Sequence, residues 1–188
     1  MSDDEELYLH DRGLDALPAG LSARLRVLDL AGNPALGALP EELGGLGHLE
    51  FLYARDCGLG ALPRSIGRLA TLRYLNVSEN ALDALPDALS ALPALVELRA
   101  DRNRLTTIPV LPYVRELHLR GNRISDVPPT IREMRRLQHL DLRENQLASL
   151  PAWLGELPLV KLDLRWNGLR RDEATVRALE ANGVLVYV

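Results

Sequence analysis

Apolar residues recur along this chain in a fixed order about every 23 residues, with polar residues between them. One complete copy contains Leu72, Leu75, Val77, Asn80, Leu82, Leu85 and Pro86. Leu75 and Val77 are two residues apart, so in a strand their side chains point to one side and their neighbours point to the other. Each copy is therefore predicted to form one short strand with a buried face and a displayed face.

The skeleton L-x-x-L-x-L-x-x-N/C-x-L returns in copies that begin at Leu25, Leu49, Leu72, Leu95, Val114, Leu137 and Leu159. A partial opening copy contains Leu7, Leu9, Leu14 and Leu17. The skeleton resembles the leucine-rich repeat family over nearly the whole chain. A proline follows most copies and makes them similar to the bacterial and plant intracellular class, which also occurs in Ras-binding scaffolds; these are Pro18, Pro40, Pro63, Pro86, Pro109, Pro128 and Pro151.

The resemblance implies an α/β fold, a leucine-rich repeat solenoid in the form of a right-handed horseshoe. Its parallel sheet would line the concave side, and short helical or 3-10 turns would lie on the convex side. We expect residues 1–188 to form one leucine-rich repeat domain of about eight coils, with 1–24 a partial repeat and 170–188 a C-terminal cap. Within the cap we predict a helix over 171–180, a stop at Gly183 and a short strand over 184–188.

An asparagine column is predicted inside the coils, because the chain turns away at each strand end and leaves backbone groups that need partners. It comprises Asn33, Asn80, Asn103, Asn122, Asn145 and Asn167, with Cys57 in place of one asparagine. Arg12 is too large and charged for the interior, so the first turn should be irregular or open to solvent. The copy that begins at Leu95 returns about four residues early, and its turn should be extended.

Aromatic residues gather at displayed strand positions in the first half of the chain: Tyr8, Phe51, Tyr53 and Tyr74. The whole chain has only eight aromatic side chains, and exposed aromatics commonly anchor protein interfaces. The alternative is that tyrosine simply suits strand surfaces. We predict an interface.

The displayed positions of the second half are charged and include Arg99, Asp101, His118, Arg120, His139, Asp141, Arg143, Asp163 and Arg165, with Trp166 beside the last. Stacked arginines can hold carboxylates or phosphates with forked hydrogen bonds. Alternating arginine and aspartate can also form a surface lattice of ion pairs, each of small energy. Both interpretations stay open.

Glu116, His118, His139 and Asp141 should lie side by side, and such a quartet could hold zinc or another divalent ion. Chance also produces such groups on a charged wall, so we predict no metal and no cofactor. No nucleophile lies beside these histidines, which argues against a hydrolase. Cys57 invites comparison with bacterial effector ligases, but the separate catalytic domain of those proteins is absent, and an inward thiol tends to be inert.

The sequence therefore favours a non-enzymatic scaffold that binds a partner protein on its concave face. By resemblance the partner would be a small GTPase or another signalling protein; recognition of a phosphorylated or acidic ligand by the arginine row is the alternative. Residues 1–94 carry a net charge of −7 and residues 95–171 one of +5. The overall charge of −4 and the interleaved acids argue against nucleic acid.

A cytoplasmic location is predicted, because the acidic start does not resemble a secretory signal and the single cysteine cannot form an internal disulfide. No apolar run approaches the roughly 20 residues of a membrane span. The scarcity of lysine, of which Lys161 is the single example, and the abundance of alanine and arginine suggest a bacterial source.

Overall fold

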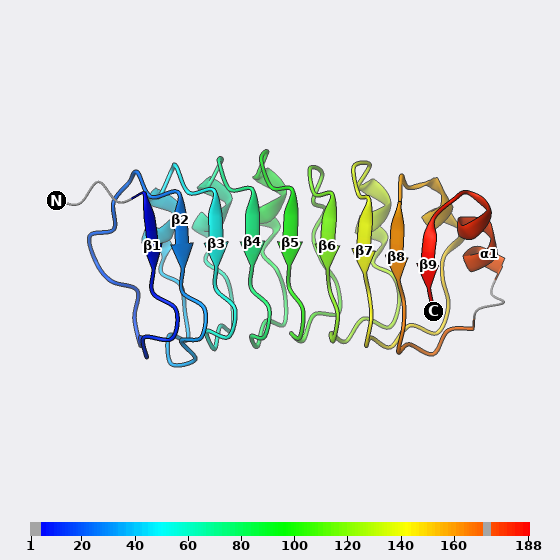
Figure 1. Ribbon diagram of the computed structural model, residues 1–188, viewed down its shortest axis with the longest axis horizontal. Helices are drawn as coiled ribbons and strands as arrows, with labels where there is room; N and C mark the ends of the chain where they lie inside the picture. Colours follow the sequence, from blue (N-terminus) through cyan, green and yellow to red (C-terminus); the bar gives the residue numbers. More distant parts are fainter. Residues whose placement is uncertain (1–4, 171–173) are drawn as a thin grey trace.

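Nine parallel strands form one sheet in chain order in the computed structural model, which describes residues 5–170 and 174–188 (Figure 1). The strands are β1 (Glu6–Tyr8), β2 (Val27–Asp29), β3 (Phe51–Tyr53), β4 (Tyr74–Asn76), β5 (Glu97–Arg99), β6 (Glu116–His118), β7 (His139–Asp141), β8 (Lys161–Asp163) and β9 (Leu185–Tyr187). Each contains three residues and pairs with the next without a register shift. The predicted solenoid is confirmed.

The core is a stack of leucine ladders. The middle residue of each strand from β2 to β8 is a leucine that is at most 1% exposed: Leu28, Leu52, Leu75, Leu98, Leu117, Leu140 and Leu162. A buried leucine contributes roughly 1.5 to 3 kcal/mol, but each layer is covered only by the next coil. Stability therefore depends on the stacking of neighbours and not on any coil alone.

Short 3-10 helices lie behind the sheet (Figure 1). They are η1 (Glu41–Gly45), η2 (Arg64–Arg68), η3 (Asp87–Ala91), η4 (Pro129–Glu133) and η5 (Ala152–Glu156). Each follows a predicted proline, whose carbonyl accepts the first hydrogen bond of the turn, as in Leu43 N–H to Pro40 O at 3.1 Å. No 3-10 helix lies between β5 and β6, which confirms the extended turn of the copy that begins at Leu95.

The asparagine column is confirmed, and Asn103 shows how it works. Its Oδ1 accepts a hydrogen bond from Leu82 N, at 3.0 Å, in the preceding coil. Its Nδ2 donates to the carbonyl oxygens of Val77 and Ala100, at 3.0 and 3.2 Å. One amide therefore closes its own turn and ties it to the neighbouring coil. Cys57 does part of this work, since its Sγ donates to Leu30 O at 3.1 Å.

The residue before this column has a positive φ in all eight coils. Two of these residues are glycines, Gly32 and Gly121; the others are Asp11, Asp56, Glu79, Arg102, Glu144 and Trp166, with φ between 52° and 62°. A left-handed conformation costs a residue with a Cβ roughly 1 to 2 kcal/mol. The tight turn at the strand end is therefore built into the repeat even where the side chain opposes it.

The two ends are closed differently. At the start, Arg12 is exposed and only its backbone N–H joins the column, at 3.0 Å from Asn33 Oδ1, so the opening turn is irregular as predicted. At the other end, α1 (Ala174–Ala181) buries Val176 and Leu179 over the last coil, and Gly183 has φ +85°. Residues 171–173 of the predicted helix lie outside the described residues. Among the helices of the described segments, none has the length and apolar character required to cross a membrane.

Candidate functional site

The displayed side of the sheet is a single surface of aligned rows, which we call the sheet face. Register places the first residue of every strand in one row, from Glu6 to Leu185, and the third in another, from Tyr8 to Tyr187. Side chains two residues after the middle leucines form a buried row on the opposite side. Every predicted site residue lies on the sheet face except Trp166, which lies at its margin.

The three central aromatics of the first half pack against one another. The ring centres of Tyr53 and Tyr74 are 5.0 Å apart, and those of Phe51 and Tyr74 are 6.5 Å apart. All three side chains are half-buried, and burial raises the pKa of Tyr74. They form a packed aromatic platform, whereas Tyr8 at the edge is 52% exposed.

Two aspartates of the second half are less displayed than predicted. Asp141 and Asp163 are buried, with 8% and 3% exposure, because Arg143 and Arg165 cover them. Arg165 donates to both carboxylate oxygens of Asp163, at 2.9 and 2.7 Å. Burial alone would raise the pKa of Asp163, but the hydrogen bonds from Arg165 and the charge of Arg143 lower it. The aspartates therefore fix the positions of Arg143 and Arg165, and these arginines lie above them at the surface of the sheet face.

Aromatic and cationic side chains meet at the C-terminal end of the sheet face. Trp166 is 60% exposed, and the guanidinium carbons of Arg120 and Arg165 lie 5.4 and 5.3 Å from its ring centre. Tyr187 on β9 is 42% exposed and lies 5.4 Å from the same Arg165 carbon. Sequence reasoning missed Tyr187 and Leu185; the alternating apolar residues of 184–188, one repeat after Lys161, were the available signal.

A third group forms where the histidines lie. Glu116 is 3.9 Å from His118 Nε2 and 3.5 Å from His139 Nδ1, as measured from its Oε2. Burial and the nearby Arg99 lower the pKa of His118. The predicted quartet is only partly assembled, because the carboxylate of Asp141 accepts hydrogen bonds from Arg143. Glu97, and not Asp141, is the carboxylate near His118 Nε2. Glu97 occupies the same strand position as Glu116, and this equivalence in the sequence could have predicted that it joins the group.

Cys57 is fully buried, and burial raises the pKa of its thiol to about 11. The thiol is therefore protonated at neutral pH and shielded from reagents, which makes it a packing residue.

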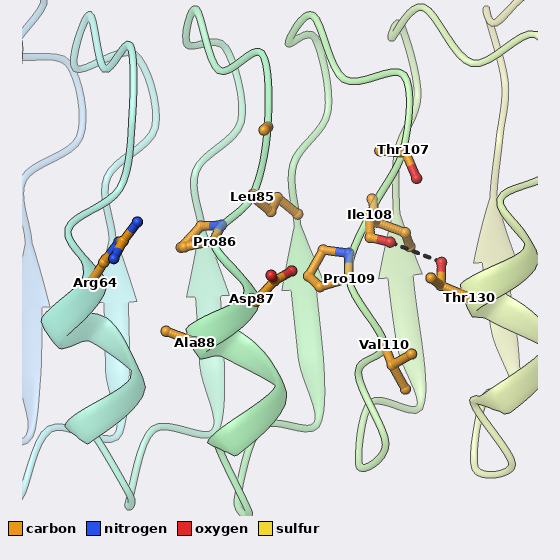
Figure 2. A pocket seen from close by; sticks show the side chains of 11 residues that line it. Arg64, Leu85, Pro86, Asp87, Ala88, Thr107, Ile108, Pro109, Val110 and Thr130 are labelled. Carbon is orange, nitrogen blue, oxygen red and sulfur yellow. Dashed lines mark hydrogen bonds between the residues drawn. The ribbon is translucent and has the colours of Figure 1, made fainter.

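Among the described residues, two coils lack a 3-10 helix on the helical side: the opening coil, between β1 and β2, and the coil between β5 and β6. The second leaves an interruption between η3 and η4. Because η3 and η4 do not touch, a groove of about 900 Å³ opens over the extended Thr107–Val110 segment. Figure 2 shows Leu85, Ile108 and Pro109 along the groove and Asp87, the first residue of η3, beside it. Thr130 Oγ1 donates a hydrogen bond to Ile108 O, at 2.8 Å, and so links the short coil to the next one.

Parallel strands stacked coil on coil, with turns behind and one open face of aligned side chains, define a solenoid repeat protein. The chain is a leucine-rich repeat protein. Two models of the leucine-rich repeat family match it, over residues 24–46 and 112–169. Proteins of this fold typically serve as non-catalytic, protein-binding scaffolds.

Two solved structures are similar to the chain. A leucine-rich repeat protein of Leptospira interrogans is 26% identical, with a TM-score of 0.71 over 88% of this chain and 49% of that one. The leucine-rich repeat ectodomain of the membrane receptor kinase GASSHO1/SCHENGEN3 from Arabidopsis thaliana is 28% identical, with a TM-score of 0.66, and was solved in complex with CASPARIAN STRIP INTEGRITY FACTOR 2. That match covers 77% of this chain and 19% of the plant chain, so this chain spans less than half of either relative.

Proposed function

We propose that this protein is a non-enzymatic scaffold that binds a partner protein through its sheet face, with the C-terminal end as the strongest anchor. The supporting observation is the group of Trp166, Tyr187 and Arg165, because exposed tryptophan, tyrosine and arginine carry most of the energy of protein interfaces. Six large apolar side chains are exposed among the described residues, and four of them lie on this face or at its margin: Tyr8, Trp166, Leu185 and Tyr187.

The backbone at Trp166 supports the same proposal. Its φ of 62° is a conformation that a bulky side chain adopts only at a cost, and glycine occupies the position in two other coils. The strain itself belongs to the repeat, but the other five non-glycine residues at this position are polar or charged, so Trp166 is the one aromatic side chain placed there. We infer that the indole is retained for what it contacts outside the molecule.

The partner we favour is a small GTPase or another signalling protein, and residues 1–188 would act as one leucine-rich repeat domain in the cytoplasm. The Arabidopsis ectodomain was solved in complex with CASPARIAN STRIP INTEGRITY FACTOR 2, which supports a binding role here. The packed platform of Phe51, Tyr53 and Tyr74 would be a second contact area. A partner that spans both ends would experience an acidic first half and a basic second half, which sets its orientation.

Affinity capture from a lysate of the source organism tests the proposal. Trp166→Ala with Arg165→Glu should reduce recovery of the partner by about 30-fold or more, the loss of a hot spot of roughly 2 kcal/mol. Tyr53→Ala with Tyr74→Ala should also reduce it. Arg132→Ala is the matched control, because Arg132 is an exposed arginine of η4 that pairs with Glu156 on the helical side. Capture that both double variants leave intact would reject the sheet face.

Binding of a phosphorylated or acidic ligand is a second candidate function. A hollow of about 360 Å³ on the sheet face is lined by two carboxylates, Glu79 and Asp101, and by five arginines: Arg55, Arg99, Arg102, Arg120 and Arg143. The Nε of Arg120 is buried there with no hydrogen-bond partner among the described residues. A phosphopeptide whose affinity falls with added salt and with Arg120→Ala would support it; weak, salt-insensitive binding would reject it.

A further inference from the structure

Two glutamates and a histidine converge on the sheet face between β5 and β6. Register pairs Glu97 with Glu116 and Arg99 with His118, so the three side chains share one patch of the sheet. Glu97, Glu116 and His118 each offer a ligand atom, and these three atoms lie within 4.8 Å of one another. Glu116 and His118 also line a hollow of about 270 Å³.

The Nε2 atom of His118 is the second observation. It is buried and has no hydrogen-bond partner within the described part of the chain. It lies 3.7 Å from Glu97 Oε1 and 3.9 Å from Glu116 Oε2, too far for a hydrogen bond to either. Two ligands of a tetrahedral ion with bonds of about 2.1 Å lie roughly 3.4 Å apart. The two distances from Nε2 exceed that spacing by about 0.3 and 0.5 Å, and the ligand atoms of the two carboxylates lie within 4.8 Å of each other.

Neighbouring side chains complete this arrangement. His139 Nδ1 is 3.5 Å from Glu116 Oε2, and its half-exposed ring can rotate to become a fourth ligand. Arg99 Nε donates to Glu97 Oε1 at 2.6 Å, an outer contact of the kind that orients a ligating carboxylate. The positive charges of Arg99 and of Lys161, which lines the same hollow, oppose a cation. We therefore expect micromolar affinity, well below that of a buried structural zinc site.

We propose that Glu97, Glu116 and His118 form a site for one divalent zinc ion, with His139 as its fourth ligand. Mixed imidazole and carboxylate donors at this spacing suit zinc, whereas magnesium and calcium require six or more oxygen ligands. The ion would link β5, β6 and β7 across the sheet face. It would stiffen the solenoid beside its short coil.

Titration calorimetry of chelator-treated protein with zinc chloride tests the site. Wild type should bind one equivalent, and His118→Ala and Glu116→Gln should each weaken binding by at least about tenfold. His10→Ala is the matched control, because His10 lies on the same face, 3.4 Å from a single carboxylate, Asp29; its titration should match that of wild type. Circular dichroism should show that all variants stay folded.

Cobalt(II) supplies a second readout, since a tetrahedral site gives intense visible absorption that His118→Ala should abolish. Three results would overturn the proposal: no saturable zinc binding by wild type at submillimolar zinc, unchanged binding by both ligand variants, or equal affinity for magnesium. The last result would mean that the carboxylates attract any dication and that His118 takes no part.

Discussion

Arg165 holds the buried carboxylate of Asp163 with two hydrogen bonds, from Nε to Oδ1 at 2.9 Å and from Nη2 to Oδ2 at 2.7 Å. Arg143 Nε lies 3.6 Å from the same carboxylate. The carboxylate therefore anchors two arginines of the sheet face from beneath. The ion pairs of the predicted lattice therefore hold Arg143 and Arg165 in the predicted arginine row.

Asp163 should support stability at neutral pH and lose that role in acid. The pKa of its carboxyl is lower in the folded protein than in the unfolded chain, where it is about 3.9. The ionised carboxylate therefore contributes fully to the free energy of unfolding above about pH 3.9, and this contribution is lost as the pH falls through the folded-state pKa. Asp163→Asn should lower the free energy of unfolding at pH 7 and flatten its decline below about pH 4. Urea unfolding across this range measures both effects.

Glu156→Gln is the control for that prediction. Glu156 forms an ion pair with Arg132 in which both side chains are about half exposed, and such pairs contribute roughly 0 to 1 kcal/mol. Its substitution should change the unfolding curve little at any pH. Equal effects of the two substitutions would mean that burial of Asp163 is irrelevant to its energy.

Gly44→Ala should destabilise the protein, and Gly45→Ala should not. A Cβ at Gly44 would lie 2.6 Å from both the Cβ and the carbonyl oxygen of Ser65, because η1 and η2 pack closely there. A Cβ at Gly45 would meet nothing within 4 Å. We expect a loss of about 1 to 3 kcal/mol for the first and no loss for the second, by thermal or denaturant unfolding. Equal stability of the two variants would show that the helical turns can separate freely.

Asn103→Ala should cost about 2 kcal/mol or more. It removes the acceptor for Leu82 N and the donors to two buried carbonyls, and each buried group left unpaired costs roughly 1 to 3 kcal/mol. Asn182→Ala, at an exposed position before Gly183, is the control and should be nearly neutral. Denaturant unfolding of the two variants decides whether the column stabilises the coils as the geometry indicates.

The repeat predicted the fold because the leucine spacing determines both strand register and burial. Leu75 faces inward wherever the coils stack, so its environment follows from the sequence alone. Side-chain partnerships on the sheet face do not follow in that way. Asp141 and Asp163 share the displayed row with Arg99, yet long arginine side chains fold over them and bury them. Tyr187 was missed because its strand belongs to the cap and lacks the leucine skeleton.

Trp166→Gly distinguishes a role of the indole in stability from a role in binding. Trp166→Gly removes an indole whose ring lies near Arg120 and Arg165, contacts of about 0.5 to 1 kcal/mol each when exposed. Glycine also adopts the left-handed backbone of this position without the penalty of roughly 1 to 2 kcal/mol that a residue with a Cβ incurs. The two effects oppose each other, so the free energy of unfolding should change by less than about 1 kcal/mol, while capture of the partner should fall. Asp56→Gly, at the same position of another coil with φ 52°, measures the backbone contribution alone. A large loss of stability in Trp166→Gly, or undiminished capture, would mean that the indole serves the fold and not a partner.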